Sequence, residues 1–256
     1  MTRRRFYAPP SAFAPEGAGV VLSEEESRHL RDVLRLRAGD EAYVFDGEGR
    51  EFACVVSEPG GRKGAARLEV RGPVEPPSPE SPLALTLAVA LLKGEKFDLV
   101  VQKATELGVG SIRPVLTKRA DVRLRDERDA VKRVERWQRL ALEAAKQSGR
   151  ARVPLVAPPQ NFQTLLTTAD GPDSLRAMFA ERGGARLDSL SATMGERPFA
   201  AAAALVGPEG GWDDEEIELA RTHGWSVVTL GGRTLRAETA AIAVCALLQN
   251  LFGDLK

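Results

Sequence analysis

One stretch of the 256-residue chain limits its fold more than any other: residues 72–82, with the sequence GPVEPPSPESP. Its five prolines exclude a helix or an inner strand, because proline has no backbone N–H to donate and clashes with a preceding helical turn. We interpret residues 73–82 as a stiff, extended linker between two domains, 1–72 and 83–256. A long loop within a single domain is the alternative interpretation.

The segment before the linker shows patterns of short strands around one helix. Ser23 with Glu26 three residues later forms a capping box, which predicts a short helix running to about Arg35. Apolar or alternating runs predict three strands, the first two joined by a DGEG turn that is typical of a β-hairpin; the runs are Glu41–Phe45, Glu51–Ser57 and Arg67–Arg71. We expect a small β-barrel over residues 1–72.

After the linker, apolar strands alternate with helical patterns, which is typical of a parallel α/β sheet. The predicted strands are Leu83–Leu92, Ile112–Leu116, Val153–Ala157, Leu175–Ala180, Ala200–Val206 and Ser226–Leu230. The predicted helices are Phe97–Leu107, Arg128–Gln147, Phe162–Thr168, Asp214–Thr222 and Glu238–Phe252. Open parallel sheets bind ligands at the carboxyl ends of their strands, so the loops that follow the strands are where a site is expected.

The small number of cysteines and histidines excludes several kinds of chemistry. The chain has only Cys54, Cys245, His29 and His223, far apart in sequence, so a structural zinc site is excluded and no metal is expected. It contains no G-x-S-x-G nucleophile elbow, no G-x-x-x-x-G-K-[ST] loop and no G-x-G-x-x-G after its first α/β strand. Both cysteines lie in apolar runs and are expected to be part of the core.

The first residues do not resemble a targeting segment. Pro9, Pro10 and Ser11 stand where a signal peptide would need its apolar segment, and no apolar run in the chain reaches transmembrane length. We therefore expect a cytoplasmic protein with no membrane partner.

Charge is balanced overall but unevenly distributed. The net charge is zero, yet residues 93–152 carry 16 basic and 9 acidic side chains, and three consecutive arginines lie at positions 3–5. A basic middle segment and a basic tip indicate a polyanionic partner such as nucleic acid. A solvated face of paired charges is the alternative.

Three glycine-rich loops follow predicted strands. Residues 207–212 (GPEGGW) let the backbone approach a ligand closely, and the neighbouring carboxylates suit a cationic or hydroxyl-bearing ligand better than a phosphate. Residues 231–240 (GGRTLRAETA) place Arg233 and Arg236 before a helix; since arginine does not complement a helix N-terminus, recognition is favoured over capping. Residues 181–184 (ERGG) are a weaker version. Ordinary turns are the alternative for the first and third loops.

Together these motifs give the chain a specific resemblance. Val206–Gly211 followed by Leu230–Ala240 resembles the two late motifs of SPOUT methyltransferases, which methylate RNA with S-adenosylmethionine. More narrowly, the chain resembles the RsmE family, which methylates N3 of one uridine in 16S ribosomal RNA of the small subunit. Five further segments carry this narrower resemblance in their order and spacing: Arg4–Tyr7, His29–Arg35, Lys93–Leu99, Gln102–Val109 and Glu143–Arg150.

The resemblance implies a fold and partners that no pattern in the chain shows by itself. It implies a SPOUT-type parallel sheet with a C-terminal trefoil knot, and a small PUA-like β-barrel over residues 1–72. It also implies S-adenosylmethionine as cofactor, and 16S rRNA or the small ribosomal subunit as partner.

The cofactor contacts follow from the matching loops, whereas the catalytic residues are a hypothesis from the chemistry that methylation of uracil N3 needs. Arg236 would stabilise the uracil anion, and Glu238 would accept the N3 proton or orient Arg236. Cofactor contacts are expected from the matching loops: Ala180, Glu181, Gly207, Glu209, Gly210, Gly211, Leu230, Gly231, Arg233, Leu235, Thr239 and Ala240. RNA contacts are expected from basic residues: Arg3, Arg4, Arg5, Lys93, Lys96, Lys118, Arg119 and Arg123.

The last predicted helix, Glu238–Phe252, is apolar nearly all round, so it must be buried on more than one side. The resemblance implies that its second side packs on another copy of the chain in a homodimer. A single-chain core that covers both sides is the alternative.

Two alternative functions also stay open: another SPOUT enzyme that acts on tRNA, and a non-catalytic RNA-binding factor in ribosome assembly.

Overall fold

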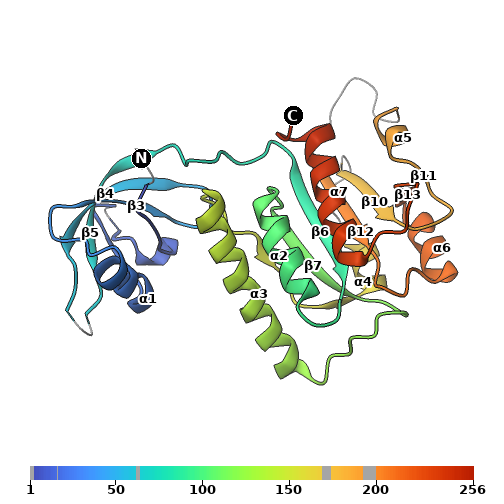
Figure 1. The fold of residues 1–256 in the computed structure, drawn as a ribbon, viewed down its shortest axis with the longest axis horizontal. Helices are drawn as coiled ribbons and strands as arrows, with labels where there is room; N and C mark the ends of the chain where they lie inside the picture. Colours follow the sequence, from blue (N-terminus) through green and yellow to red (C-terminus); the bar gives the residue numbers. More distant parts are fainter. Residues whose placement is uncertain (1–2, 16, 62–63, 169–173, 193–199) are drawn as a thin grey trace. The chain divides into compact units, whose positions relative to one another are not determined.

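The computed structural model describes residues 3–15, 17–61, 64–168, 174–192 and 200–256 (Figure 1). The chain divides into two compact units. Unit 1 comprises Met1–Glu80 and Ala145–Val153, and unit 2 comprises Ser81–Ala144 and Pro154–Lys256. Within these residues, no helix is long and apolar enough to cross a membrane.

Unit 1 is built on a five-stranded sheet with the order β1-β3-β4-β5-β2. The first strand runs parallel to β3, and the remaining neighbours are antiparallel, including the expected hairpin β3–β4. Register shifts within the β4–β5 pair, the first at Ala53/Cys54, bend the sheet. The strands are β1 (Arg5–Tyr7), β2 (Gly19–Val21), β3 (Glu41–Phe45), β4 (Glu51–Glu58) and β5 (Arg67–Val74).

The core of unit 1 lies between this sheet and one short helix. Phe6, Val44 and Leu30 are fully buried in it, and Cys54 is buried beside them as expected from its apolar surroundings. The sequence did not predict β1, β2 or the 3-10 turn η1 (Pro10–Ala12), because each is too short for a periodic pattern.

The predicted helix from Ser23 to Arg35 has two parts. Ser23 caps α1 (Glu24–Arg28) as expected, accepting a hydrogen bond from the Glu26 amide at 3.2 Å. The Glu26 carboxylate binds Lys146 at 2.5 Å instead of completing the capping box. Lys146 lies on the second segment of unit 1. Beyond Arg28 the chain continues as one wider π-helical turn, η2 (His29–Val33).

The segment 145–153 belongs to unit 1, which no local pattern in the sequence indicates. Arg150 has a side chain only 4% exposed and binds Glu80 at 2.6 Å. Arg5 donates to the carbonyl oxygens of Lys146 and Arg150 at 3.2 and 3.0 Å. These buried contacts join the end of α3 (Glu127–Ser148) and the residues after it to the N-terminal sheet.

Unit 2 contains the expected parallel α/β sheet, with eight strands among the described residues. Its order is β11-β13-β10-β12-β6-β7-β8, with β9 also beside β7, and every pairing is parallel. The strands are β6 (Ala84–Ala90), β7 (Ser111–Leu116), β8 (Leu155–Val156), β9 (Gln160–Asn161), β10 (Ser174–Phe179), β11 (Ala185–Arg186), β12 (Ala201–Val206) and β13 (Ser226–Thr229).

Helices cover both faces of this sheet, so most residues of its central strands β6 and β12 are buried. On one face α7 lies beside α2 and packs on β6 and β12, as Figure 1 shows. On the other face α4 and α6 enclose an apolar cluster that contains Leu165, Ile217 and Trp212. The helices of unit 2 besides α3 are α2 (Lys96–Glu106), α4 (Phe162–Thr167), α5 (Leu187–Ala192), α6 (Asp214–Thr222) and α7 (Ala237–Phe252).

The strand order brings three loops together. Strands β13, β10 and β12 are neighbours and parallel, so the segments that follow Thr229, Phe179 and Val206 leave the same edge of the sheet. These segments are the three glycine-rich loops of the sequence.

Candidate functional site

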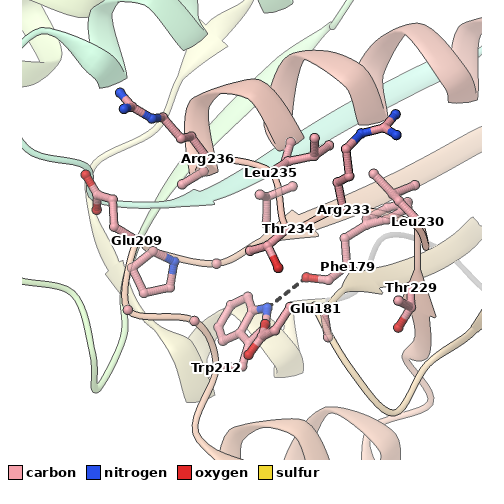
Figure 2. A pocket seen from close by; sticks show the side chains of 18 of the residues that line it. Phe179, Glu181, Glu209, Trp212, Thr229, Leu230, Arg233, Thr234, Leu235 and Arg236 are labelled. Atoms are coloured by element: carbon pink, nitrogen blue, oxygen red, sulfur yellow. Dashed lines mark hydrogen bonds between the residues drawn. The ribbon is translucent and has the colours of Figure 1, made fainter.

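A cavity of about 820 Å³ opens where the three loops meet (Figure 2). Its size falls within the roughly 300–1,000 Å³ that is usual for small-molecule sites. It is lined by residues 179–181, 206–212 and 229–237, together with Lys96 and Ala240. Each of the three segments comes directly after one strand of the sheet, so the fold alone assembles the cavity.

Most residues expected to bind a cofactor line this cavity. Those that do so are Ala180, Glu181, Gly207, Glu209, Gly210, Gly211, Leu230, Gly231, Arg233, Leu235 and Ala240, and Arg236 joins them. Thr239 and Glu238 are not among the lining residues. Both lie in the first turn of α7 with their neighbours Ala237 and Ala240 toward the cavity, since residues of one helical turn face different directions.

Trp212 closes the inner side of the cavity and was not expected there. Its ring is 1% exposed, and its Nε1 donates to the carbonyl oxygen of Phe179 at 2.8 Å (Figure 2). A Cβ atom on Gly207 would lie 2.9 Å from this ring, so the close approach requires glycine. A buried indole N–H needs an acceptor, and this one ties the loop after β12 to the end of β10.

The loop after β10 is held by Arg182. This side chain donates to Asp214 at 2.8 Å and to the Trp212 carbonyl at 3.3 Å, and it also binds the Glu181 carboxylate. A Cβ on Gly211, whose φ is +68°, would lie 2.7 Å from Glu181. Glu181 is thereby fixed against the backbone of the first loop and presents its carboxylate at the cavity.

A second carboxylate, Glu209, faces the cavity from the other side. Lys96 at the start of α2 binds it at 2.8 Å. Burial raises the pKa of Glu209, but the hydrogen bonds from Lys96 and from backbone amides outweigh burial, and the pKa lies below its ordinary value. Glu209 is therefore ionised at neutral pH.

The loop before α7 supplies backbone and cations. Gly231 and Gly232 both have positive φ, +77° and +72°, which brings the backbone around in a tight turn. Arg236 occupies the N-cap position of α7, and neither it nor Arg233 forms an ion pair with any residue that the structure describes. In Figure 2, Glu209 and Arg236 lie toward one end of the cavity, and Thr229 and Leu230 toward the other.

The basic residues expected to contact RNA divide into paired and unpaired sets. In unit 2, Lys93 binds Asp121 at 2.6 Å, Arg119 binds Asp213 at 3.2 Å, and Lys118 binds Asp213 and Glu215. Arg123 is exposed and has no ion pair within the described ranges. Most of these cations are therefore paired with carboxylates, as the alternative interpretation of a face of paired charges predicts.

The arginines at the start of unit 1 differ from one another. Arg3 and Arg5 both bind Glu51, at 3.2 and 2.8 Å, and the Glu51 side chain is completely buried. Arg5 itself is only 8% exposed. Arg4 points outward and is exposed. Two of these three arginines therefore have a structural partner inside the unit.

The other groups considered from the sequence lie outside the cavity. Cys54 and Cys245 are buried, and burial raises the pKa of each thiol to about 12, so the expectation of core cysteines is confirmed. In the part of the chain that the structure describes, no three His, Cys, Asp or Glu side chains are grouped as metal ligands.

Comparison with known proteins gives this arrangement a class. A family model described as an RNA methyltransferase domain matches residues 79–249, and one described as an RNA methyltransferase PUA domain matches residues 22–69. The segment that forms most of unit 2 is thus an RNA methyltransferase domain.

Individual relatives narrow the class. The chain is 35% identical to ribosomal RNA small subunit methyltransferase E of Synechocystis, over 91% of this chain and 74% of that protein. It is 32% identical to the Bacillus subtilis protein of the same name, over 91% and 92%. A crystal structure of this methyltransferase from Neisseria gonorrhoeae, bound to S-adenosylmethionine, matches all of both chains with a TM-score of 0.85 and 33% identity. The chain belongs to the ribosomal RNA small subunit methyltransferase E family.

Proposed function

We propose that this protein transfers a methyl group from S-adenosylmethionine to N3 of one uridine in 16S ribosomal RNA. The observation that carries the proposal is the cavity formed by three glycine-rich loops, with two carboxylates on its walls and Arg236 at one end. The family of the chain and the S-adenosylmethionine bound to its Neisseria relative support the same assignment.

The residues present fit this cofactor. Glu181 and Glu209 suit a ligand that carries a sulfonium and an ammonium group, because opposite charges attract strongly in a partly buried site. The tight backbone turn at Gly231 and Gly232 suits a planar ring with polar edges. When bound, the cofactor supplies a methyl group on a positively charged sulfur. Transfer of this methyl group to the acceptor atom needs no metal ion.

The protein's part in the reaction is to hold the uridine and stabilise its anion. Uracil N3 carries a proton at neutral pH and becomes nucleophilic when that proton leaves. Arg236, exposed at the cavity and without a competing carboxylate among the described residues, is the group we assign to the uracil oxygens. Its positive charge favours the uracil anion.

The role of Glu238 stays a prediction. Its Oε2 is buried without a hydrogen-bond partner in the described part of the chain, and the residue does not line the cavity. A proton acceptor must lie within hydrogen-bond reach of N3 directly or through one water. We therefore do not assign Glu238 as the direct base, and its role in orienting Arg236 stays a prediction, since no ion pair joins the two side chains in the described part of the chain.

We further propose a cytoplasmic homodimer joined through α7. The outer side of this helix exposes Leu247 and Leu251, 37% and 39% accessible, beside Ala243. An exposed apolar stripe on a helix that starts at the cofactor cavity suits a two-fold interface, in which each copy offers the same surface.

The decisive experiment is methyl transfer from labelled S-adenosylmethionine to small-subunit ribosomal RNA, followed by mass spectrometry of the nucleosides. We expect 3-methyluridine in the RNA, and its loss from the ribosomal RNA of a deletion strain. Methylation of tRNA instead would assign a different SPOUT activity. RNA binding without any methyl transfer would make the protein a non-catalytic assembly factor.

A further inference from the structure

One segment of unit 1, residues 28–37, has a geometry that the fold does not require. At Arg28 the α-helix widens into η2, where the Leu34 amide donates to the His29 carbonyl at 3.0 Å. The chain then turns sharply, and the Leu36 amide donates back to the Leu30 carbonyl at 3.1 Å. Single π-helical turns of this kind occur often at functional sites.

The residue at the centre of that turn is strained. Arg35 has φ +54°, and it is the one non-glycine residue with positive φ in the described ranges. A left-handed residue after a helix is normally glycine, since a Cβ crowds the neighbouring carbonyl there. Backbone strain of this kind persists where the side chain is needed.

The flanking residues hold the turn rigidly. Leu30 and Leu36 on either side are buried in the core, 0% and 4% exposed. Arg31 also donates to the carbonyl of Gly61 at 2.9 Å, which fixes the turn to the loop before β5. The side chains between these anchors are therefore presented outward from a fixed backbone.

What the turn presents is basic and partly apolar. Val33 is 64% exposed, one of the two most exposed large hydrophobic side chains described. Arg28 pairs with Glu24 and Arg31 with Asp32, whereas Arg35 and Arg37 form no ion pair with any described residue. Residues 28–37 contain four arginines and one aspartate, so this segment of the sequence is basic.

We propose that the turn of Val33, Arg35 and Arg37 is a contact site for the substrate RNA. Arg35 and Arg37 would bind phosphates with their guanidinium groups, and Val33 would pack on an exposed base or sugar. Two unpaired guanidinium groups on a rigid turn favour a polyanion over a protein partner. The inference rests on the proposed function, because that function supplies the RNA.

The test compares full-length wild type with Arg35→Gly, using transcribed 16S ribosomal RNA as the probe. Glycine accepts the left-handed conformation, so the denaturation midpoint should stay unchanged or rise. The affinity for RNA should nonetheless fall severalfold, and the slope of log affinity against log salt should become shallower by about one. A residue with only a structural role would not give a more stable protein that binds RNA less well.

Further variants sharpen the comparison. Arg35→Lys should recover part of the affinity, because it restores the charge but not the bidentate geometry. Val33→Ser should weaken binding without changing the salt slope. Arg71→Ala is the matched control, since Arg71 is an exposed arginine of the same unit that pairs with Glu69, and it should bind as wild type does.

The outcomes separate the two proposals. Wild-type RNA affinity and salt slope in Arg35→Gly would overturn the site. A defect seen with small-subunit particles but not with naked RNA would assign the turn to a protein partner instead, and would also overturn it. If Arg35→Gly loses RNA affinity while the wild type transfers no methyl group, the contact site stands and the proposed activity fails.

Discussion

The shape of the cavity depends on single residues that have no side chain. Gly207 lies against the indole of Trp212, and Gly211 lies against the carboxylate of Glu181. The Gly211–Glu181 contact joins two loops, and the Gly207–Trp212 contact packs the loop after β12 on itself, so a methyl group at either position would distort the cavity wall. The sensitivity of the site is therefore greatest at positions that carry no chemistry.

Replacement of Gly207 by alanine should destabilise unit 2 and weaken cofactor binding together. Overpacking against a buried ring costs about 1–3 kcal/mol, and the hydrogen bond from Trp212 to the Phe179 carbonyl holds this ring in place. Urea denaturation and calorimetric titration of S-adenosylmethionine measure the two effects. Gly110→Ala is the control, since its nearest atom would be an ordinary 3.8 Å away. Equal behaviour of the two variants would contradict the packing argument.

Replacement of Arg236 by alanine should remove catalysis and spare the cofactor site. Loss of one preorganised charge at a developing anion lowers turnover by roughly 10²–10³-fold. The measurements are single-turnover methyl transfer and the dissociation constant of S-adenosylmethionine, with the exposed Arg139→Ala on α3 as control. Undiminished turnover in Arg236→Ala would remove the residue from the mechanism.

For single residues, the sequence predicts which loops line the cavity better than it predicts which charged residues pair with one another. The three loops could be found because glycines after apolar strands leave a visible pattern. Trp212, Phe179 and Thr234 also line the cavity, but the sequence does not assign them to it. An aromatic or polar residue next to a glycine-rich loop belongs to the core as often as to a ligand site. The pairing of Arg5 with Glu51 depends on contacts 46 residues apart, which no local pattern encodes.

Pairs of elements are joined by ion pairs whose burial decides their importance. Between β1 and β4, Arg5 and Glu51 are almost entirely enclosed. Between α2 and the loop after β12, Lys96 and Glu209 remain partly open to solvent. The first pair is expected to matter for folding, and the second for how charge in the cavity responds to pH.

Replacement of Arg5 by methionine should destabilise unit 1 without a direct loss of RNA contacts. It leaves a fully buried carboxylate without its strongest partner, which costs roughly 3–5 kcal/mol. The double variant Arg5→Met with Glu51→Gln should recover part of this loss, because the buried charge is gone. Thermal denaturation of the wild type, Arg5→Met, Glu51→Gln and the double variant measures the coupling between the two residues. Additive losses would mean that the pair is not coupled.

Replacement of Lys96 by methionine should move the acid limit of cofactor binding to higher pH. In the wild type the pKa of Glu209 is below its ordinary value, so the carboxylate stays charged until the pH falls through that lowered pKa. Without Lys96 the pKa rises, and affinity should begin to fall earlier as the pH drops from about 7 toward 4. Lys103→Met, which removes a lysine paired with Glu106 on the same helix, is the control and should leave the profile unchanged.

Elements were predictable where the pattern was long. The strands and helices of unit 2 that the sequence predicts are all present with ends shifted by a few residues, because burial on both faces gives long apolar runs. The strands β9 and β11 have two residues each and show no periodicity. The π-helical turn was unpredictable for another reason: its residues read as an ordinary continuation of α1.

For the whole molecule, the sequence indicates the class of each unit but not the path of the chain. Parallel strands follow from alternation, yet the order β13-β10-β12-β6 depends on which strand edges meet, and alternation does not specify that. The return of residues 145–153 to unit 1 likewise depends on a buried pairing, Arg150 with Glu80, of residues 70 positions apart. The boundary at residues 73–82 stays a prediction from proline content, and β5 continues through Pro73 to Val74 at its start, where we expected no inner strand.

At this scale the prediction concerns assembly. Replacement of Leu247 and Leu251 by glutamate should convert a dimer into monomers, because two like charges would face their copies across a two-fold axis. Light scattering after gel filtration measures the mass, with a single chain at 27.6 kDa. Val131→Glu on α3, another exposed apolar position at 51%, is the control. A wild-type mass of one chain, with full activity, would refute the dimer.

The ion pairs of the basic residues in unit 2 also bear on selectivity for RNA. Lys93, Lys96, Lys118 and Arg119 are each already bound to a carboxylate, so a nucleic acid must displace an internal partner before it gains a phosphate contact. We therefore expect random strands to gain little from charge alone at these four positions. We expect the carboxylates paired with these four cations to lower nonspecific binding of RNA to unit 2.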